Sequence, residues 1–338
     1  MATIGNTALT FTDWAKRHQD KKVALICEML AQTNAILEDM RWVEGNLPTG
    51  HMHTIRTGLP SGTWRILNYG VANAKSTTAQ VTDSCGMLEI YSEVDKKLAD
   101  LGGNTASFRL SEDKAFLEGL SQQMAASLFY GNQATNPERI TGLAPRYGSV
   151  STATAQTANN VIDGAGTGSD NTSIWFVIWG DHSCFGIFPK GSKAGLQMRD
   201  LGEHTLKDAD GGQYQGYRTH YSWDAGFTVR DWRYVVRICN IDVSDLATIT
   251  STGLGSSADL MMLMGRAIHK PPSLTMGSPV WYANRTARQY IDLQKARQNG
   301  LHLTLSDVMA GQYKFMDNVL GFPIRTVDQI TNAEARIV

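Results

Sequence analysis

Apolar positions recur at helical spacing in four segments of the chain, which are the predicted helices: residues 20–40, 111–130, 258–270 and 283–298. The second helix is predicted most strongly, because Ser111 is a good N-cap and Gly131 is a natural residue after the last turn. Its apolar stripe consists of Leu117, Leu120, Met124 and Leu128. A helix over 112–130 spans about 28 Å, which is long enough to form the backbone of a flat domain.

The first predicted helix carries an apolar seam with alternating spacings of three and four, formed by Val23, Ile26, Leu30, Thr33, Leu37 and Met40. This is the spacing of a coiled coil, although the seam is short and includes a threonine. Two interpretations follow. The helix packs on the protein's own core, or it is an arm that docks on another subunit.

Apolar runs predict strands in the second half of the chain. Residues 173–179 form a short continuous run that is typical of a buried strand. Further strands are predicted within 201–240, on both sides of a turn at 208–212, at 279–282 and at 320–330. Because helices and strands are segregated, without regular βαβ alternation or an internal repeat, the predicted fold class is α+β.

Residues 51–84 pose a different problem, because they predict a long hairpin that has no apolar face. Val, Ile, Thr, Trp and Tyr favour two strands, with the turn expected at Gly70 to Ala74. Charged and amide side chains interrupt both strands, and adjacent Ile66 and Leu67 would point in opposite directions. An isolated two-stranded hairpin is only marginally stable in water, so this one needs a partner surface.

Two further segments are less regular. Residues 86–104 fit either a strand or a helix. Residues 148–173 are small and polar and predict a loop, an insertion or a domain boundary. The G-x-G-x-G within 164–170 is followed by polar residues and a strand, whereas a dinucleotide-binding motif opens a helix. We therefore interpret 164–170 as a flexible loop.

Composition excludes several classes of protein. The chain has 338 residues, 42% of them hydrophobic, which is enough for a sizeable core. It contains no run of about 18 apolar residues and no signal-peptide pattern at the start. The 31 basic and 32 acidic residues almost cancel, so only non-specific contact with nucleic acid is expected. Four dispersed cysteines, without C-x-x-C, argue against a disulfide framework or zinc knuckle and fit synthesis in the cytoplasm.

No catalytic or metal-binding constellation emerges from the motifs. Ser183 and Cys184 lie in the stretch DHSC, but adjacent residues of one short segment do not converge on a substrate, and turn residues are the simpler interpretation. His51 and His53 would share one face of a strand, yet no third ligand is visible, so we interpret them as solvated. Residues 208–212, DADGG, lack the closing glutamate of a calcium loop and fit a hairpin turn.

The order of these features resembles the major capsid proteins of tailed bacteriophages with the Hong-Kong-97-type fold, in which an N-terminal arm precedes an extended loop, a long spine helix and an α+β remainder. Several short sequence segments resemble those of major capsid proteins from short-tailed phages and related prophages. The segments that carry this likeness are WVEGNLPTG (42–50), GLPSGTWRILNYGV (58–71), FPKGSKAGLQMRDLGE (188–203), VRDWRYVVRICNIDVSDL (229–246), PVWYANRTARQYIDLQ (279–294) and LGFPIRTVD (320–328).

The resemblance implies a division of the chain into an N-terminal arm (1–50), an extended loop (51–92), a peripheral domain (93–172) with its spine helix (107–131), a strand-rich part shared between peripheral and axial domains (173–319), and a strand returning to the peripheral domain (320–338). It also implies contacts between subunits. The residues expected to make them are Ile55, Trp64, Ile66, Leu67 and Tyr69 of the loop and Val23, Ile26 and Leu30 of the arm.

The expected function is that of a shell-forming structural protein without a cofactor. Copies of the chain would form hexamers and pentamers in the bacterial cytoplasm and enclose double-stranded DNA in the virion. The expected partners are other copies, a portal protein, a cement protein and a separate scaffolding protein, because the arm begins within about a dozen residues of Met1. A covalent cross-link from Lys75 is not expected, since no acceptor motif is found.

Two alternatives remain at this point. One is a nanocompartment shell of the same fold that encloses an enzyme, which sequence separates poorly from a phage capsid. The other is a cysteine or serine hydrolase using Cys184 or Ser183, which predicts labelling by a thiol- or serine-directed probe.

Overall fold

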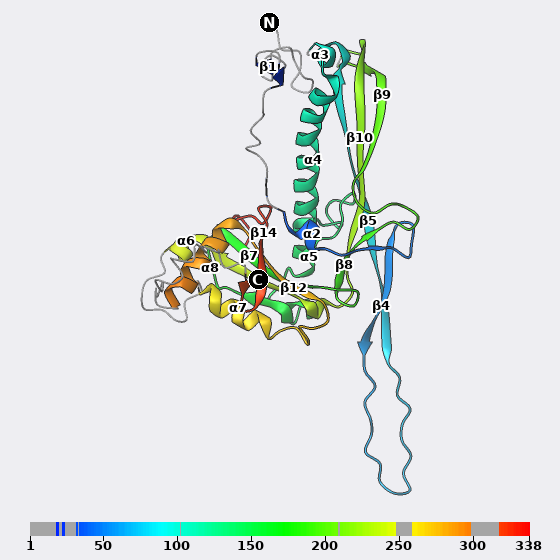
Figure 1. Cartoon of the computed structure of the whole chain (residues 1–338). Helices are drawn as coiled ribbons and strands as arrows, with labels where there is room; N and C mark the ends of the chain where they lie inside the picture. The colour runs from blue at the N-terminus through cyan, green and yellow to red at the C-terminus, as the bar shows by residue number, and fades with distance from the viewer. Residues whose placement is uncertain are drawn as a thin grey trace.

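A computed structural model describes residues 18–19, 22–23, 32, 34–101, 103–208, 210–247, 259–298 and 318–338. The molecule consists of a long upright part, a compact lobe beside its lower half and a hairpin that projects beyond both (Figure 1). Helix α4, Thr105–Tyr130, runs along three long strands in the upright part. These strands are β5 (Thr77–Asp95), β9 (Gln197–Lys207) and β10 (Gln213–Val229).

One mixed sheet contains twelve of the described strands and continues from the lobe into the hairpin. Its main order is β13-β14-β12-β7-β8-β10-β5-β4, with β11 and β6 beside β7, β3 beside β8 and β9 beside β10. The remaining bounds are β3 Trp42–Glu44, β4 Gly50–Gly58, β6 Val161–Asp163, β7 Asn171–Trp179, β8 Cys184–Phe188, β11 Val235–Asp242, β12 Ser278–Ala283, β13 Asn318–Val319 and β14 Phe322–Thr326. This confirms the α+β fold class.

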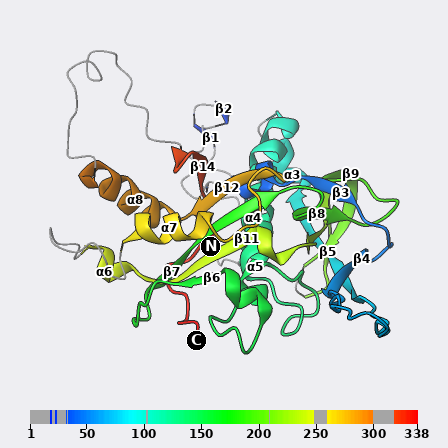
Figure 2. The ribbon, with the colours of Figure 1, turned by 90° about the horizontal axis from the view of Figure 1, so that it is seen from below.

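Shorter helices surround the sheet: α2 (Ile36–Asp39), α3 (Lys96–Asp100), α5 (Leu143–Arg146), α6 (Val243–Ala247), α7 (Leu260–Ile268) and α8 (Arg285–Gln298), with 3₁₀ turns at Gln156–Asn160 and Trp232–Tyr234. Figure 2, seen from below, shows α7 and α8 beside the strands of the lobe and β4 at the opposite end of the molecule. The predicted helices at 258–270 and 283–298 are therefore confirmed.

Strand β7 is buried on both faces, which explains its uninterrupted apolar sequence. Its side chains alternate between two cores. Trp175, Val177 and Trp179 pack with residues of α4 and α5, whereas Ile174, Phe176 and Ile178 pack with residues of α7 and α8. The prediction of a buried strand at 173–179 is confirmed.

Helix α4 begins earlier than its sequence pattern suggests. The side chain of Asn104 accepts a hydrogen bond from the backbone N–H of Ser107 and is the N-cap, so Ser111 lies inside the helix. Asn104 is as good a capping residue as Ser111 and precedes it by seven positions, so the sequence alone does not decide between them. The expected end is confirmed, since the N–H of Gly131 bonds to the carbonyl of Ser127. Any side chain on Gly131 would collide with the carbonyl of Ile140.

We expect Leu120→Ala to lower the free energy of unfolding by about 2–5 kcal/mol, because truncating a buried leucine removes apolar contacts and leaves a cavity. Leu120 is only 2% exposed and lies in the predicted stripe, in which Met124 and Leu128 are also buried. Leu110 of the same helix is 60% exposed, so Leu110→Ala is a matched control. Chemical denaturation measures both. Equal midpoints for Leu120→Ala and the wild type would contradict the prediction.

The helix predicted at 20–40 is wrong in its first turn. Lys22–Val23 is a strand, β2, which pairs with β1 at His18–Gln19. Helical structure is described at Ile36–Asp39, and Ile26 and Leu30 lie outside the described residues. Periodicity over so short a segment stabilises a helix weakly, so tertiary contacts decide its extent.

The two irregular segments are ordered by local contacts. Residues 86–104 contain both predicted structures, because β5 ends at Asp95, whose side chain caps α3 by accepting from the N–H of Lys97. The segment 148–173 is only in part the predicted loop, because it contains the 3₁₀ turn Gln156–Asn160, strand β6 and the start of β7. Residues 164–170 form a loop, as predicted, and its backbone bonds directly to β11. A side chain on Gly164 or Gly166 would come within 3 Å of the carbonyl oxygen of Asn240.

Candidate assembly surface

The projecting hairpin is built on one long strand that also belongs to the body of the protein. Residues 77–84 of β5 pair antiparallel with β4. Directly afterwards, residues 85–95 of β5 pair with β10. Because the same strand continues through both ladders, the orientation of the hairpin is coupled to the upright sheet (Figure 1).

The outer edge of β4 is fixed near its base by a side chain. Asn46 Nδ2 donates to the carbonyl of Met52 at 2.6 Å, and Asn46 Oδ1 accepts from the N–H of Met52 at 2.7 Å. The amide thus satisfies both backbone groups of one strand residue, as a neighbouring strand would do. Gly50 permits the close pairing at the base, since any side chain there would collide with the carbonyl of Asp83.

The tip of the hairpin differs from the prediction. Residues 59–76 contain no strand, and the turn lies at 66–69, where the N–H of Tyr69 bonds to the carbonyl of Ile66 at 3.2 Å. Asn68 has a φ of 70°, a left-handed conformation that asparagine tolerates better than most residues. The sequence offers Gly70 nearby as a competing turn residue, which is why the turn was expected at Gly70 to Ala74.

The loop 59–76 exposes a group of large apolar side chains. Trp64 is fully exposed, and Leu59 and Leu67 are each 81% exposed. The others are Ile66, Tyr69 and Val71. Soluble monomers rarely present so many neighbouring apolar side chains, and such groups mark interaction surfaces.

Four of the five loop residues predicted to contact another subunit belong to this exposed group: Trp64, Ile66, Leu67 and Tyr69. The fifth, Ile55, lies on β4 and is half-buried. Sequence reasoning missed Leu59 and Val71. Both lie in the predicted hairpin 51–84. Because that segment has no apolar face of its own, its sequence already indicated that their side chains would be exposed. For the arm residues, nothing is described of the side chain of Val23, and Ile26 and Leu30 lie outside the described residues.

A buried polar cluster lies at the base of the hairpin. Arg146 Nη2 and Asp83 Oδ1 form an ion pair at 2.7 Å, and Asp83 Oδ2 is 3.9 Å from Nδ1 of His53. His53 and Asp83 are each 6% exposed, and the ring of His51 stacks on that of His53. The interpretation as solvated histidines is therefore wrong for His53, whereas His51 is half-buried against the ring of Phe185. Burial lowers the pKa of His51 and of His53.

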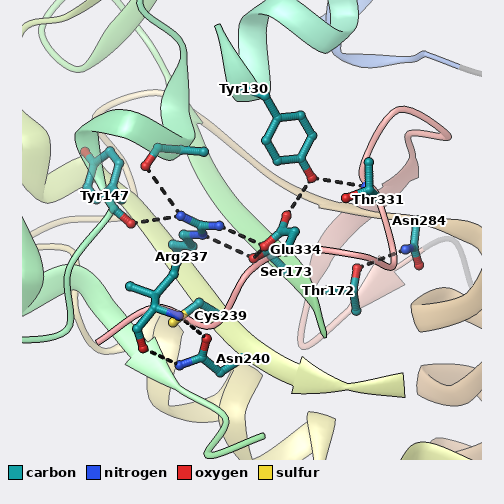
Figure 3. Close-up of polar contacts among 12 residues, drawn as sticks. Tyr130, Tyr147, Thr172, Ser173, Arg237, Cys239, Asn240, Asn284, Thr331 and Glu334 are labelled. Atoms are coloured by element: carbon teal, nitrogen blue, oxygen red, sulfur yellow. Dashed lines mark hydrogen bonds and ion pairs between the residues drawn. The ribbon is translucent and has the colours of Figure 1, made fainter. Parts of the chain in front are cut away.

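A second buried polar cluster joins the C-terminal segment to the end of α4 (Figure 3). Arg237 of β11 forms an ion pair with Glu334 at 2.8 Å. Its guanidinium also donates to the hydroxyl of Ser173 and to the carbonyl of Tyr147. Glu334 accepts hydrogen bonds from the hydroxyls of Ser173 and Tyr130. Every polar group of this cluster has a partner, so it holds residues 331–338 in place and leaves no group to bind a ligand.

The nucleophile candidates Ser183 and Cys184 are both fully buried. The Ser183 hydroxyl donates to the carbonyl of Ile178 at 2.5 Å, and the Cys184 thiol donates to the same carbonyl. Burial strongly raises the pKa of the Cys184 thiol, so it remains a thiol and not the reactive thiolate. The predicted turn at the end of the preceding strand is found at 181–183, just after β7, whereas Cys184 is the first residue of β8.

The described part of the chain offers neither a metal-binding group nor a membrane-spanning helix. No group of three or more His, Cys, Asp or Glu side chains there is arranged to hold a metal ion. No helix there is long and apolar enough to cross a membrane.

Comparison with known proteins gives one strong likeness. Residues 18–338 match the model of the family described as major capsid protein GP7. The structure of bacteriophage Epsilon15 contains a chain with 35% sequence identity and a TM-score of 0.81, and the match covers 100% of this chain and 99% of that one.

More distant structures are also similar. A capsid of the native GTA particle has 10% identity and a TM-score of 0.46, over 69% of this chain and 98% of that one. The SrpI encapsulin of Synechococcus elongatus PCC 7942 has 10% identity and a TM-score of 0.40, over 73% and 99% of the two chains. No curated protein matches.

Proposed function

The chain belongs to the family of major capsid protein GP7, and from this premise we propose that it builds its shell by docking the loop 59–76 on a neighbouring subunit. As a member of this family the chain is a structural protein of the bacteriophage virion, and it self-associates into the icosahedral capsid. Its α+β architecture, with a long helix and a projecting hairpin, is the expected Hong-Kong-97-type fold.

The observation that carries the proposal is the exposure of the apolar loop. Trp64, Leu67 and their neighbours have no core of their own at the tip of the hairpin. Burial of apolar surface contributes roughly 25 cal/mol per Å², so covering this group by another subunit supplies a driving force for assembly. The loop carries Arg65 and Lys75 but no acidic side chain, which favours an acceptor surface that is apolar and not basic.

Contacts of this kind produce closed assemblies. A loop on one face that docks on a different face of the next copy is a heterologous contact, and repetition by rotation closes into rings. We propose that these rings are the hexamers and pentamers of the shell. Each subunit is then held by several contacts at once, so the shell is stable even where a single contact is modest.

We assign the parts of the chain as the sequence suggested. Residues 1–50 form the arm and 51–92 the extended loop. Residues 93–172 form the peripheral domain with α4 as its spine, and 173–319 are shared with the axial domain. Residues 320–338 return to the peripheral domain. Support for this last assignment comes from the contact of Glu334 with Tyr130 at the end of α4.

Further partners are part of the proposal. A separate scaffolding protein guides closure of the shell, a portal protein occupies one vertex, and a cement protein stabilises the outside. The lining holds DNA by non-specific contacts, in accordance with the nearly neutral net charge of −1.

Light scattering and negative-stain microscopy of the purified chain, with and without the candidate scaffold, test the proposal. We expect rings, capsomers or shells. A monodisperse monomer under every condition would contradict docking of the loop. Closed shells of correct size from the chain alone would remove the need for a scaffold.

A further inference from the structure

The base of the hairpin contains three buried polar atoms that lack a hydrogen-bond partner. They are Nδ1 of His51, Nδ1 of His53 and Oδ2 of Asp83. The first two belong to β4 and the third to β5, so the cluster spans the two strands where the hairpin leaves the body. Unsatisfied buried polar atoms are costly and rare in native proteins, which makes a cluster of three a candidate for a function.

The charged groups around the cluster disfavour a metal ion. Two cationic side chains face it, Arg146 of α5 and Arg230 just after β10, and Arg146 already occupies the other oxygen of Asp83. Asp83 is the only acidic group among the charged neighbours that act on His53. A divalent cation placed here would meet two guanidinium groups and share one carboxylate. A proton adds only one positive charge, so the cluster can bind a proton more readily than a divalent cation.

We propose that the His51–His53–Asp83 cluster is a proton-sensitive hinge, in which protonation of the histidines loosens the packing of β4 against the body. With both histidines neutral, β4 packs His51 edge-on against Phe185 of β8 at a centroid distance of 5.6 Å. With both protonated, four cationic groups surround the single carboxylate of Asp83, which is itself buried. Opening the base hydrates the imidazolium groups and relieves this repulsion.

The sign of the pH dependence follows from burial. Burial is the largest cause that lowers the pKa of both histidines in the closed hairpin, while the opened hairpin restores their ordinary value near 6.5. The open state therefore binds protons more strongly, and closure is lost as the pH falls below about 6.5. The consequence of this hinge for assembly rests on the proposed docking of the loop 59–76. Opening of the hairpin base itself is a property of the single chain.

Amide hydrogen exchange of the purified full-length chain between pH 7.5 and pH 5 tests the hinge, after correction for intrinsic exchange rates. We expect protection of β4 to fall by at least about fivefold over this range. Each histidine, with a pKa near 6.5 in the open state, can increase the opening equilibrium constant by at most about thirtyfold at pH 5. Protection of the buried strand β7 should stay constant, which separates local opening from global unfolding.

Three variants make the test specific. In His51→Gln combined with His53→Gln, β4 should lose its pH dependence whatever its absolute protection. His182→Gln changes an exposed turn histidine and should keep the wild-type dependence. Asp83→Asn removes the only carboxylate and should shift opening to higher pH. An unchanged pH dependence of β4 in the double variant would overturn the hinge, whereas loss of rings or shells at all pH values would contradict only the docking role.

Discussion

Glu334→Ala is expected to lower the free energy of unfolding by about 3–5 kcal/mol, although Glu334 lies only four residues from the C-terminus. The substitution removes the only carboxylate among the described residues that bonds to the buried guanidinium of Arg237, and it leaves that charge uncompensated. It also removes the acceptor for the hydroxyls of Ser173 and Tyr130. Breaking one side of a buried ion pair costs more than the pair contributes, because the desolvated partner remains.

Two control variants isolate the effect of burial. Arg285 also forms an ion pair, a bidentate one with Asp328, but its side chain is 67% exposed, so Arg285→Ala should cost less than about 1 kcal/mol. Glu334→Gln retains an acceptor for Tyr130 and should fall between the two. Denaturant titration followed by tryptophan fluorescence measures all three, since Trp175 lies under the Arg237 guanidinium. Equal losses for Glu334→Ala and Arg285→Ala would show that the C-terminal segment is not locked by the buried pair.

Local patterns in the sequence predicted those elements whose partners are nearby or whose burial is complete. The apolar run of β7 and the stripe of α4 each specify structure within a few residues. The start of α4 and the turn of the hairpin were misplaced, since Asn104 and Asn68 compete with other good candidates for the same role. Propensity does not choose between two suitable residues; the surrounding contacts do.

Polar partners distant in the sequence could not be predicted. Arg237 and Glu334 are 97 positions apart, and Arg146 and Asp83 are 63 apart. Nothing local distinguishes these residues from solvated charges, and the same holds for His53, which resembles an exposed strand histidine until the register of β4 is known. The exposed loop could be predicted for the opposite reason, because the absence of an apolar face is visible in the sequence itself.

Trp64→Ala should leave the single chain as stable as the wild type while weakening assembly. The indole is fully exposed and makes no contact that supports the fold of its own chain, so the free energy of unfolding should change by less than about 0.5 kcal/mol. Tryptophan is enriched among the residues that dominate subunit contacts, where truncation costs about 2 kcal/mol or more. That loss corresponds to a contact roughly thirtyfold weaker.

Sedimentation and light scattering over a range of protein concentrations measure the effect as a rise in the concentration at which rings or shells appear. Asn73→Ala is the matched control, since Asn73 is exposed in the same loop but offers little apolar surface, and it should assemble as the wild type does. A lower melting temperature of the unassembled Trp64→Ala chain would place Trp64 in a core. Assembly at the wild-type concentration would mean that the loop docks through Leu59 or Leu67 instead. A shell contains many copies of this contact. Even a moderate loss of binding free energy at each copy should therefore cause a large decrease in the fraction of assembled chains.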